Sequence, residues 1–230
     1  MDNSNTIEVN RDFIEKCAPE IADFSVSFVN LSRNQDRETA NLGGSGTLVY
    51  AGGKHAILTA DHVLDNLPTR GEVGLTLSSV YRPILHRFSF YMEDSRKITI
   101  ARGIEGSEGP EGPDLGIVII SEVTANRIED NNKIFYNLEK RRNRIIQNPS
   151  FLSTGIWYLC GMPVEWTEEL PEQGMFKPVM VFRGACGEVN IPTEEVRGAF
   201  DYLYLDIEIS ESYKGPISFN GVSGGGLIAN

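Results

Sequence analysis

The sequence predicts an all-β protein with two β regions, and three observations lead to this fold class. Short runs rich in β-branched and aromatic residues recur along the chain. Glycines and polar residues separate these runs, and no long helical pattern lies between them, which argues against a parallel sheet with crossover helices. The 230 residues, 40% of them hydrophobic, are enough to form the hydrophobic core of a protein with two β regions.

The first β region is expected over residues 24–120, after an N-terminal arm of residues 1–23. Within the arm, residues 11–22 have the spacing of a short amphipathic helix that Pro19 breaks or kinks. The strands expected in the first region lie at 24–29, 45–50, 55–59, 73–77, 88–92, 97–101 and 115–120.

Residues 121–150 interrupt the β pattern and are predicted to be a linker with some helix, because polar residues dominate and apolar ones recur at helical spacing. Its basic cluster at 140–144 is typical of a solvated helix end, with a docking patch as the alternative. The second β region then covers residues 151–230, with strands expected at 156–160, 179–182 and 202–209.

Charge and cysteine content restrict the partners and the compartment. The net charge of -11 argues against nucleic acid, which clustered Lys and Arg would have to neutralise. The polar start lacks the features of a secretory signal, and no run is long enough to span a bilayer, so no membrane partner is expected. Cys17, Cys160 and Cys186 are odd in number and lack ligand-like spacing. We therefore expect a cytoplasmic protein without metal or cofactor.

Two segments of the first region carry candidates for acid–base chemistry. His62 follows an apolar strand, and the small Ala60 leaves room for the imidazole to turn into a cleft. Asp114 stands at the start of another apolar strand after a Gly/Pro-rich loop, where it can be desolvated and aimed at a histidine. Each also has a common structural role, as a packed histidine and as a turn aspartate. His55 and His86 lack such settings and are interpreted as surface or packing residues.

A third segment, near residue 230, carries a candidate nucleophile. Ser223 has glycines on both sides, which allow a tight turn that exposes its hydroxyl. The backbone N–H groups of Gly221 and Ser223 can then point at one spot, as an oxyanion hole requires. Acyl transfer needs such donors together with a base and an acid that orients it. A flexible Gly/Ser turn is the alternative.

Together these segments resemble the trypsin-like peptidases of the chymotrypsin fold, especially their bacterial Deg/HtrA-like branch. The resemblance implies two six-stranded antiparallel barrels with the active site between them, and a serine endopeptidase under regulation, with the triad His62, Asp114 and Ser223. The motifs that carry it are Gly-Ser-Gly-Thr at 44–47, Thr-Ala-Asp-His at 59–62, Asp-Leu-Gly-Ile-Val at 114–118, Gly-Met-Pro at 161–163 and Gly-Val-Ser-Gly-Gly at 221–225.

The chain departs from the family in two places. Val222 stands where trypsin has the aspartate that receives a newly cut N-terminus, so activation by that ion pair is not expected. About seven residues follow Ser223, whereas the family normally has two or more further strands there. We therefore expect a second barrel that lacks its last strands. Either the chain is a truncated piece, or another segment, a regulatory partner or another chain completes the barrel, or the domain is defective. The resemblance places Ile217 and Phe219 at the substrate pocket, where no acidic side chain favours Arg or Lys substrates.

Three other functions compete with a serine peptidase acting on proteins or peptides. An α/β-hydrolase is disfavoured because its serine precedes the acid and the histidine. A chymotrypsin-fold cysteine peptidase using Cys186 is disfavoured, because only about twenty residues separate Gly161 from Cys186 and several strands would have to fit between them. An inactive trypsin-like fold that binds peptides or proteins is the third alternative.

Overall fold

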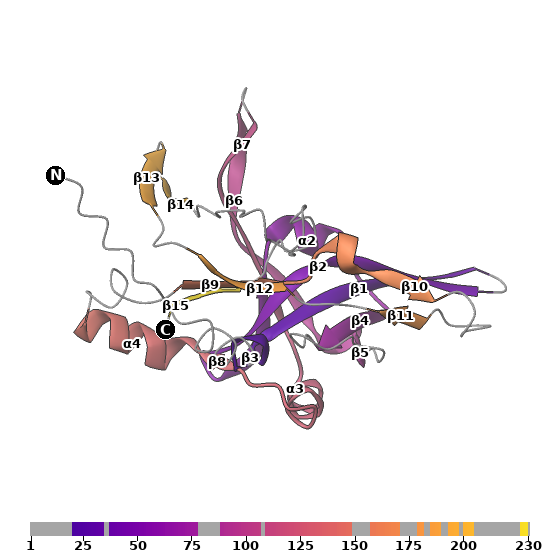
Figure 1. The fold of residues 1–230 in the computed structure, drawn as a ribbon. Coiled ribbons are helices and arrows are strands. Elements are labelled where there is room, and N and C mark those ends of the chain that lie inside the picture. The colour runs from indigo at the N-terminus through magenta and orange to yellow at the C-terminus, as the bar shows by residue number, and fades with distance from the viewer. Residues whose placement is uncertain are drawn as a thin grey trace.

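The structure of the protein is a computed structural model, and most of its described residues form β-strands (Figure 1). No helix within the described ranges is long and apolar enough to cross a membrane. The residues described are 20–34, 37–77, 88–106, 109–148, 157–170, 179–181, 185–189, 193–197, 200–204 and 226–229.

An eight-stranded sheet forms the main body, with the strand order β5-β4-β1-β2-β3-β7-β6 and β8 beside β2. All neighbours are antiparallel except the β2–β8 pair. Strands β1 to β3 follow one another as hairpins and β4 returns beside β1, which is a Greek-key order. The strands are β1 (Ser25–Asn34), β2 (Arg37–Ala51), β3 (Lys54–Thr59), β4 (Glu72–Leu77), β5 (Phe88–Tyr91), β6 (Arg96–Gly106), β7 (Gly109–Ile119) and β8 (Tyr136–Asn137).

The two outermost strands of this sheet are consecutive in the chain. Strand β5 leads through the 3₁₀ helix η1 (Met92–Asp94) and Ser95 directly into β6. The N–H of Met92 donates to the carbonyl of Gly71 at 2.9 Å, which fastens this connection to the start of β4. Because so few residues join the two ends, the sheet has to curl around its hydrophobic face.

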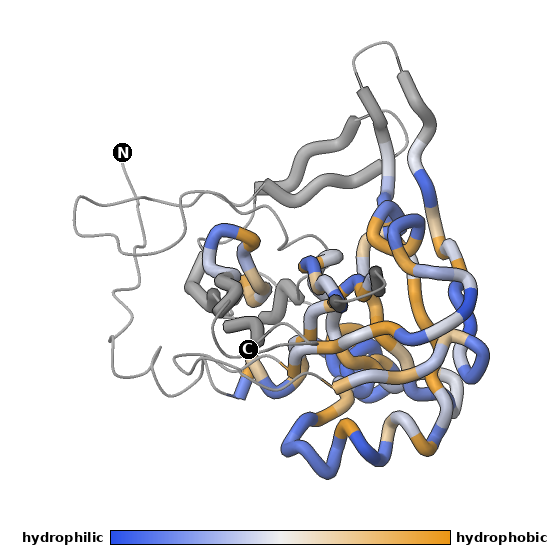
Figure 2. The backbone as a smooth tube through the Cα atoms, turned by 90° about the vertical axis from the view of Figure 1, so that its right-hand side faces the viewer, coloured by the Kyte–Doolittle hydropathy of each residue, from blue (hydrophilic) through white to orange (hydrophobic). Residues whose placement is uncertain are grey.

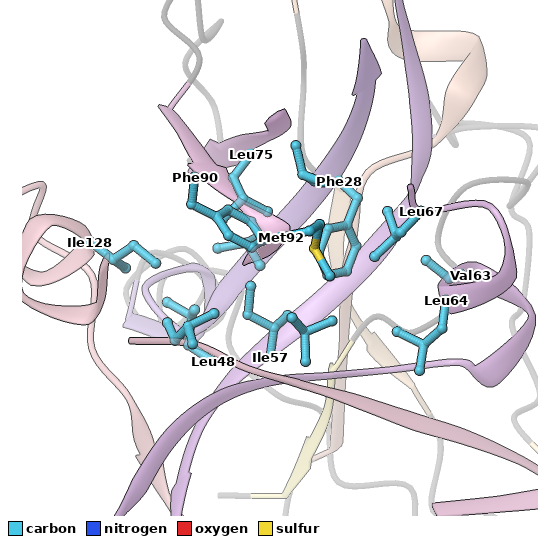
Figure 3. Packing of buried hydrophobic residues seen from close by; sticks show 14 of the residues in the cluster. Phe28, Leu48, Ile57, Val63, Leu64, Leu67, Leu75, Phe90, Met92 and Ile128 are labelled. Atoms are coloured by element: carbon cyan, nitrogen blue, oxygen red, sulfur yellow. The ribbon is translucent and has the colours of Figure 1, made fainter. Parts of the chain in front are cut away.

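The core lies inside this curl (Figure 3). Leu48 and Ile57 come from the central strands, and Leu75 and Phe90 come from one end of the sheet. Helix α3 (Glu122–Glu129) adds Ile128 to the same cluster. Ser121 caps this helix, because its side chain accepts the N–H of Thr124 at 3.2 Å. Figure 2 shows hydrophobic and hydrophilic stretches alternating along this part of the chain, as expected for strands with one buried face.

The second β region is also antiparallel. Strand β9 (Trp157–Gly161) lies between β12 (Ala185–Val189) and β15 (Gly226–Ala229). Two further pairs are β10 (Glu168–Leu170) with β11 (Val179–Val181), and β13 (Thr193–Arg197) with β14 (Phe200–Tyr204). The short η2 (Val164–Trp166) follows β9. The predicted all-β class is therefore confirmed.

Residues 121–150 contain two helices, α3 and α4 (Leu138–Gln147). Helix α3 packs into the core of the main sheet, and β8 pairs with β2, so this segment is built onto the first β region. Helix α4 has no buried residue and carries the basic cluster. Of the expected N-terminal helix, only residues 20–22 lie within the described ranges, and they are helical.

Candidate active site

His62 lies in the first turn of a five-residue helix, α2 (Asp61–Asp65), which begins directly after β3. The expectation of a histidine at a strand end needs this correction: the chain leaves the sheet at Ala60 and turns at once into the helix. Val63 and Leu64 are buried in the core, whereas the His62 side chain is 54% exposed. The helix therefore presents the imidazole to solvent from a fixed base.

Two glycines let α2 approach the sheet closely. A Cβ on Gly44, whose φ is +138°, would lie 2.6 Å from a methyl of Val63. A Cβ on Gly116 would lie 2.9 Å from Cγ of Leu64 and 3.2 Å from Cα of Asp61. Contacts of a Cβ below 3.0 Å are essentially never seen, and each of the two glycines would have one, so glycine at both positions allows α2 to pack closely against β2 and β7.

Asp114 lies in the middle of β7, which corrects the expectation of an acid at the start of a strand after a loop. The Gly/Pro-rich residues 109–113 belong to the same strand: residues 109–111 pair with β6, and a register irregularity opposite residues 112 and 113 separates them from Asp114. On its other side, β7 pairs with β3 only from Gly116 to Ile119. At Asp114 that side is open, because β3 has ended and α2 occupies its place.

His62 and Asp114 meet through two contacts. The imidazole Nδ1 makes a short hydrogen bond to Asp114 Oδ2, and the backbone N–H of His62 donates to Asp114 Oδ1 at 2.9 Å. The residue before α2, Ala60, offers no capping side chain. Asp114 therefore also satisfies N–H groups at the start of the helix that would otherwise lack a partner.

The surroundings of Asp114 lower the pKa of its carboxyl below the usual value. Partial burial is the largest single influence and would raise the pKa, but hydrogen bonds from the His62 ring and from the backbone of His62 and Asp61 together outweigh it. An ionised carboxylate can only accept hydrogen bonds, so Nδ1 of His62 must carry the proton. In the neutral ring, Nε2 then has a lone pair available as a base.

Side chains of β6 fasten α2 at both of its ends. Lys97 Nζ donates to the carbonyls of Leu64 at 3.0 Å and of Leu67 at 2.8 Å. Arg102 pairs with Asp61 through a short contact and with Asp65 at 2.8 Å. Sequence reasoning missed these residues and Gly116. A glycine two positions after Asp114 was the one available signal, whereas Lys97 and Arg102 lie in a strand without a motif.

The other residues singled out from the sequence are not brought to this pair within the described part of the chain. Ser223, Gly221, Ile217, Phe219, Cys17 and His86 lie outside the described residues. His55 is a packing residue, with its ring centroid 5.0 Å from that of Tyr50 and 4.7 Å from that of Phe135. The backbone of Cys186 lies within β12, opposite Cys160 of β9.

Among the described residues, no group of three or more His, Cys, Asp or Glu side chains could hold a metal ion. Comparison with protein-family models and with curated proteins finds no match for this chain.

Proposed function

We propose that the protein is a trypsin-like serine endopeptidase with the triad His62, Asp114 and Ser223. The observation that carries this proposal is the two-point contact between Asp114 and His62, which fixes both the backbone and the ring of the histidine. Asp114 is 52 positions away in sequence and reaches His62 from a different strand. This is the arrangement in which a carboxylate holds a histidine in the tautomer needed by a general base.

In the proposed reaction, Nε2 of His62 takes the hydroxyl proton of Ser223 as the oxygen attacks a peptide carbonyl. Asp114 stabilises the imidazolium, and the N–H groups of Gly221 and Ser223 bind the oxyanion. The imidazolium then gives its proton to the leaving amine, which leaves an acyl-enzyme. Water, deprotonated by the same histidine, attacks the ester and releases Ser223.

The strand that follows Ser223 supports its place in the triad. Strand β15 begins at Gly226, three residues after the serine, and pairs with β9. Its first residue lies opposite Cys160, two residues before Met162. Gly226, three residues after Ser223 in the sequence, thus lies at the end of β9 that leads into Met162.

Met162 in turn contacts the part of the main sheet that leads to His62. Its backbone N–H donates to Ser45 Oγ at 3.0 Å. The carbonyl of Ser45 accepts the hydroxyl of Thr59 at 2.6 Å, and Thr59 precedes His62 by three residues. A continuous series of paired strands and hydrogen bonds therefore links the segments on which the proposed base and nucleophile depend.

The finer fold belongs to the same proposal. A Greek-key sheet whose end strands are joined by only four residues supports closure into a first barrel, although its path has seven strands where the resemblance implies six. The antiparallel strands from β9 to β15 support a second barrel, with the active site between the two. The arm, linker and barrel boundaries expected from the sequence remain part of this proposal.

Cys186 is the rival nucleophile within the same fold. Its backbone lies inside the paired part of β12, with Ala185 to Val189 opposite successive residues of β9. A nucleophile that also supplies an oxyanion N–H needs a turn that leaves this N–H unpaired. Cys186 lies in a regular ladder of paired residues rather than in such a turn, which favours Ser223 as the nucleophile.

Labelling with a fluorophosphonate probe tests the assignment. We expect the full-length protein to be labelled, Cys186→Ala to be labelled equally, and Ser223→Ala and His62→Ala to lose labelling by several orders of magnitude. Labelling lost in Cys186→Ala but kept in Ser223→Ala would transfer the function to the cysteine. Absence of labelling in the folded full-length protein would favour a module that binds peptides or proteins.

The substrate, regulation and compartment are proposed on less direct grounds. With Ile217 and Phe219 at the pocket, we expect cleavage after small or apolar side chains, which a peptide library measures. The odd number of cysteines and their lack of ligand-like spacing are in keeping with a cytoplasmic protein. A peptidase in that compartment needs restraint, and a regulatory protein partner would supply it; bulk proteolysis by the isolated chain would contradict this.

A further inference from the structure

An arginine of β6 connects the helix that carries His62 to the strand that carries Asp114. The Nε of Arg102 makes a short contact with Oδ2 of Asp61, and its Nη2 lies 2.8 Å from Oδ2 of Asp65. These two carboxylates are the first and last residues of α2, and His62 lies between them. One planar guanidinium thus grips both ends of the helix.

The register of β6 and β7 explains how Arg102 reaches this position. Arg102 lies directly opposite Asp114, and directly opposed residues on antiparallel strands point to the same side of a sheet. The register shifts between Thr99 and Ala101, and again between Arg102 and Ile104. Irregularities of this kind redirect side chains, and these two flank the pair of residues opposite Leu115 and Asp114. The same pair of opposed residues, Arg102 and Asp114, therefore anchors α2 and orients its histidine.

The burial of Asp61 shows how strongly this helix depends on the arginine. Its side chain is fully buried, with Oδ2 bonded to Arg102 and no hydrogen-bond partner for Oδ1 among the described residues. A buried carboxylate without a cation is unfavourable, and an ion pair in such a place fixes one conformation more than it adds stability. The hydrogen bond that Arg102 donates to Asp61 raises the pKa of Arg102 above its usual value, so the guanidinium keeps its charge.

A helix of five residues does not hold its own orientation in water, and its contacts with the sheet must set it. Lys97 binds carbonyls at the end of α2, but neither of its contacts reaches the turn with His62. We propose that Arg102 is a positioning residue that holds His62 in register with Asp114 by gripping Asp61 and Asp65. The expected effect of Arg102 on turnover rests on the proposed peptidase function. Its expected effect on the position of His62 does not.

Two measurements on Arg102→Gln, Arg102→Lys and the control Arg96→Gln test the proposal. Arg96 is an exposed arginine on the same strand. The first measurement is the low-field NMR resonance of the proton between His62 Nδ1 and Asp114, assigned by its loss in Asp114→Asn. The second is kcat and KM for a peptide substrate, well below the Tm of each variant.

We expect Arg102→Gln to broaden or lose the resonance and to lower kcat about 10- to 100-fold with little change in KM, because small misplacements of a catalytic group cost this much. Arg102→Lys should fall between it and the wild type, since an ammonium cannot grip two carboxylates as a fork does. Asp65→Asn, which leaves the Asp61 contact intact, should have a smaller effect. Arg96→Gln should match the wild type.

A native resonance and native kcat in Arg102→Gln would overturn the proposal, as would a lower Tm with both unchanged. If Arg102→Gln does not fold, the wild type, Asp65→Asn and Arg102→Lys are compared instead. We expect the resonance and kcat to decline in that order, and equal spectra and equal kcat values in all three proteins would overturn the proposal. A wild-type protein that shows the resonance without peptidase activity would sink the proposed function, while the spectra still test Arg102.

Discussion

At the scale of single residues, Asp114 has two tasks that are usually divided between groups. It fixes the ring of His62, and it accepts the backbone N–H of His62 at the start of a helix whose preceding residue, Ala60, cannot cap it. The position of the proposed base and its tautomer therefore depend on one carboxylate. This coupling explains why a pair found by its sequence context also has a structural role.

A second residue with an unusual environment is Lys133, which is 6% exposed. Its Nζ donates to the carbonyl of Ala22 at 2.8 Å, and the N–H of Ile134 donates to the carbonyl of Asp23 at 3.1 Å. The chain after α3 is thereby fastened to the residues that precede β1. Burial lowers the pKa of Lys133 to about 8, while the nearby Asp23 and Cys160 act in the opposite direction.

This pKa predicts that stability rises with pH in the alkaline range. Between about pH 8 and the ordinary lysine pKa of about 10.4, the unfolded chain binds the proton that the folded protein has lost, so the free energy of unfolding increases by up to about 3 kcal/mol. Chemical denaturation of the wild type and of Lys133→Met at several pH values measures the difference between them. Cys160→Ala in both backgrounds removes the influence of the neighbouring Cys160 on Lys133; parallel pH profiles of the wild type and Lys133→Met would contradict the prediction.

At the scale of elements, α2 illustrates what local sequence can and cannot predict. His62 and Asp114 were recognisable from the residues around them. The helix itself was not, because five residues show no helical periodicity and contacts from β2, β6 and β7 hold them. Arg102 was equally hidden, since its place opposite Asp114 depends on two irregularities in the register of β6 and β7.

The close packing of α2 on β7 predicts a specific conflict at Gly116. The Cβ of Gly116→Ala meets the side chain of Leu64 and the backbone of Asp61, so we expect a loss of about 1–3 kcal/mol in the free energy of unfolding. Leu64→Ala alone should cost about 2–5 kcal/mol, because it leaves a cavity. In the double variant the new methyl occupies part of that space, so the total should be smaller than the sum. Denaturant unfolding of the four proteins measures this coupling, and strict additivity would show that the new methyl fits beside Leu64 without displacing α2.

At the scale of the whole molecule, the alternation of short β runs was enough to predict the all-β class. The strand order was beyond reach from these runs, because pairing between distant strands leaves no local pattern. Asp114 is an example: the Gly/Pro-rich residues before it resemble a loop in the sequence, and only their pairing with β6 identifies them as part of a strand. The proposed nucleophile remains a prediction from its motif.

Four buried hydroxyl side chains of the main sheet, Ser27, Ser45, Thr59 and Thr76, lie where Met162 of the second β region contacts it; we call them the hydroxyl seam. Met162 lies on this seam. Its N–H donates to Ser45 Oγ at 3.0 Å, its sulfur accepts from Thr76 Oγ1 at 3.4 Å, and its side chain packs against Val29 and Ala40. Hydroxyl groups suit this place because they satisfy the backbone of an incoming strand that the main sheet does not pair with.

The seam predicts that one hydroxyl matters both for stability and for the proposed active site. Ser45→Ala leaves the N–H of Met162 without its acceptor, so we expect a loss of about 1–3 kcal/mol in the free energy of unfolding. Ser32→Ala is the matched control. Ser32 Oγ bonds Thr39 Oγ1 at 2.6 Å between β1 and β2, the strand that also contains Ser45, but in an exposed position, where such substitutions change the free energy of unfolding by no more than about 0.5 kcal/mol. Denaturant unfolding measures the free energy of unfolding of both variants.

The same substitution should affect the proposed active site. Since β9 also pairs with β15, the strand after Ser223, fluorophosphonate labelling of the folded protein should slow in Ser45→Ala and not in Ser32→Ala. Equal stability of the two variants would show that water replaces the hydroxyl at no cost, and unchanged labelling in a destabilised Ser45→Ala would show that the seam holds the two β regions together without aligning the triad.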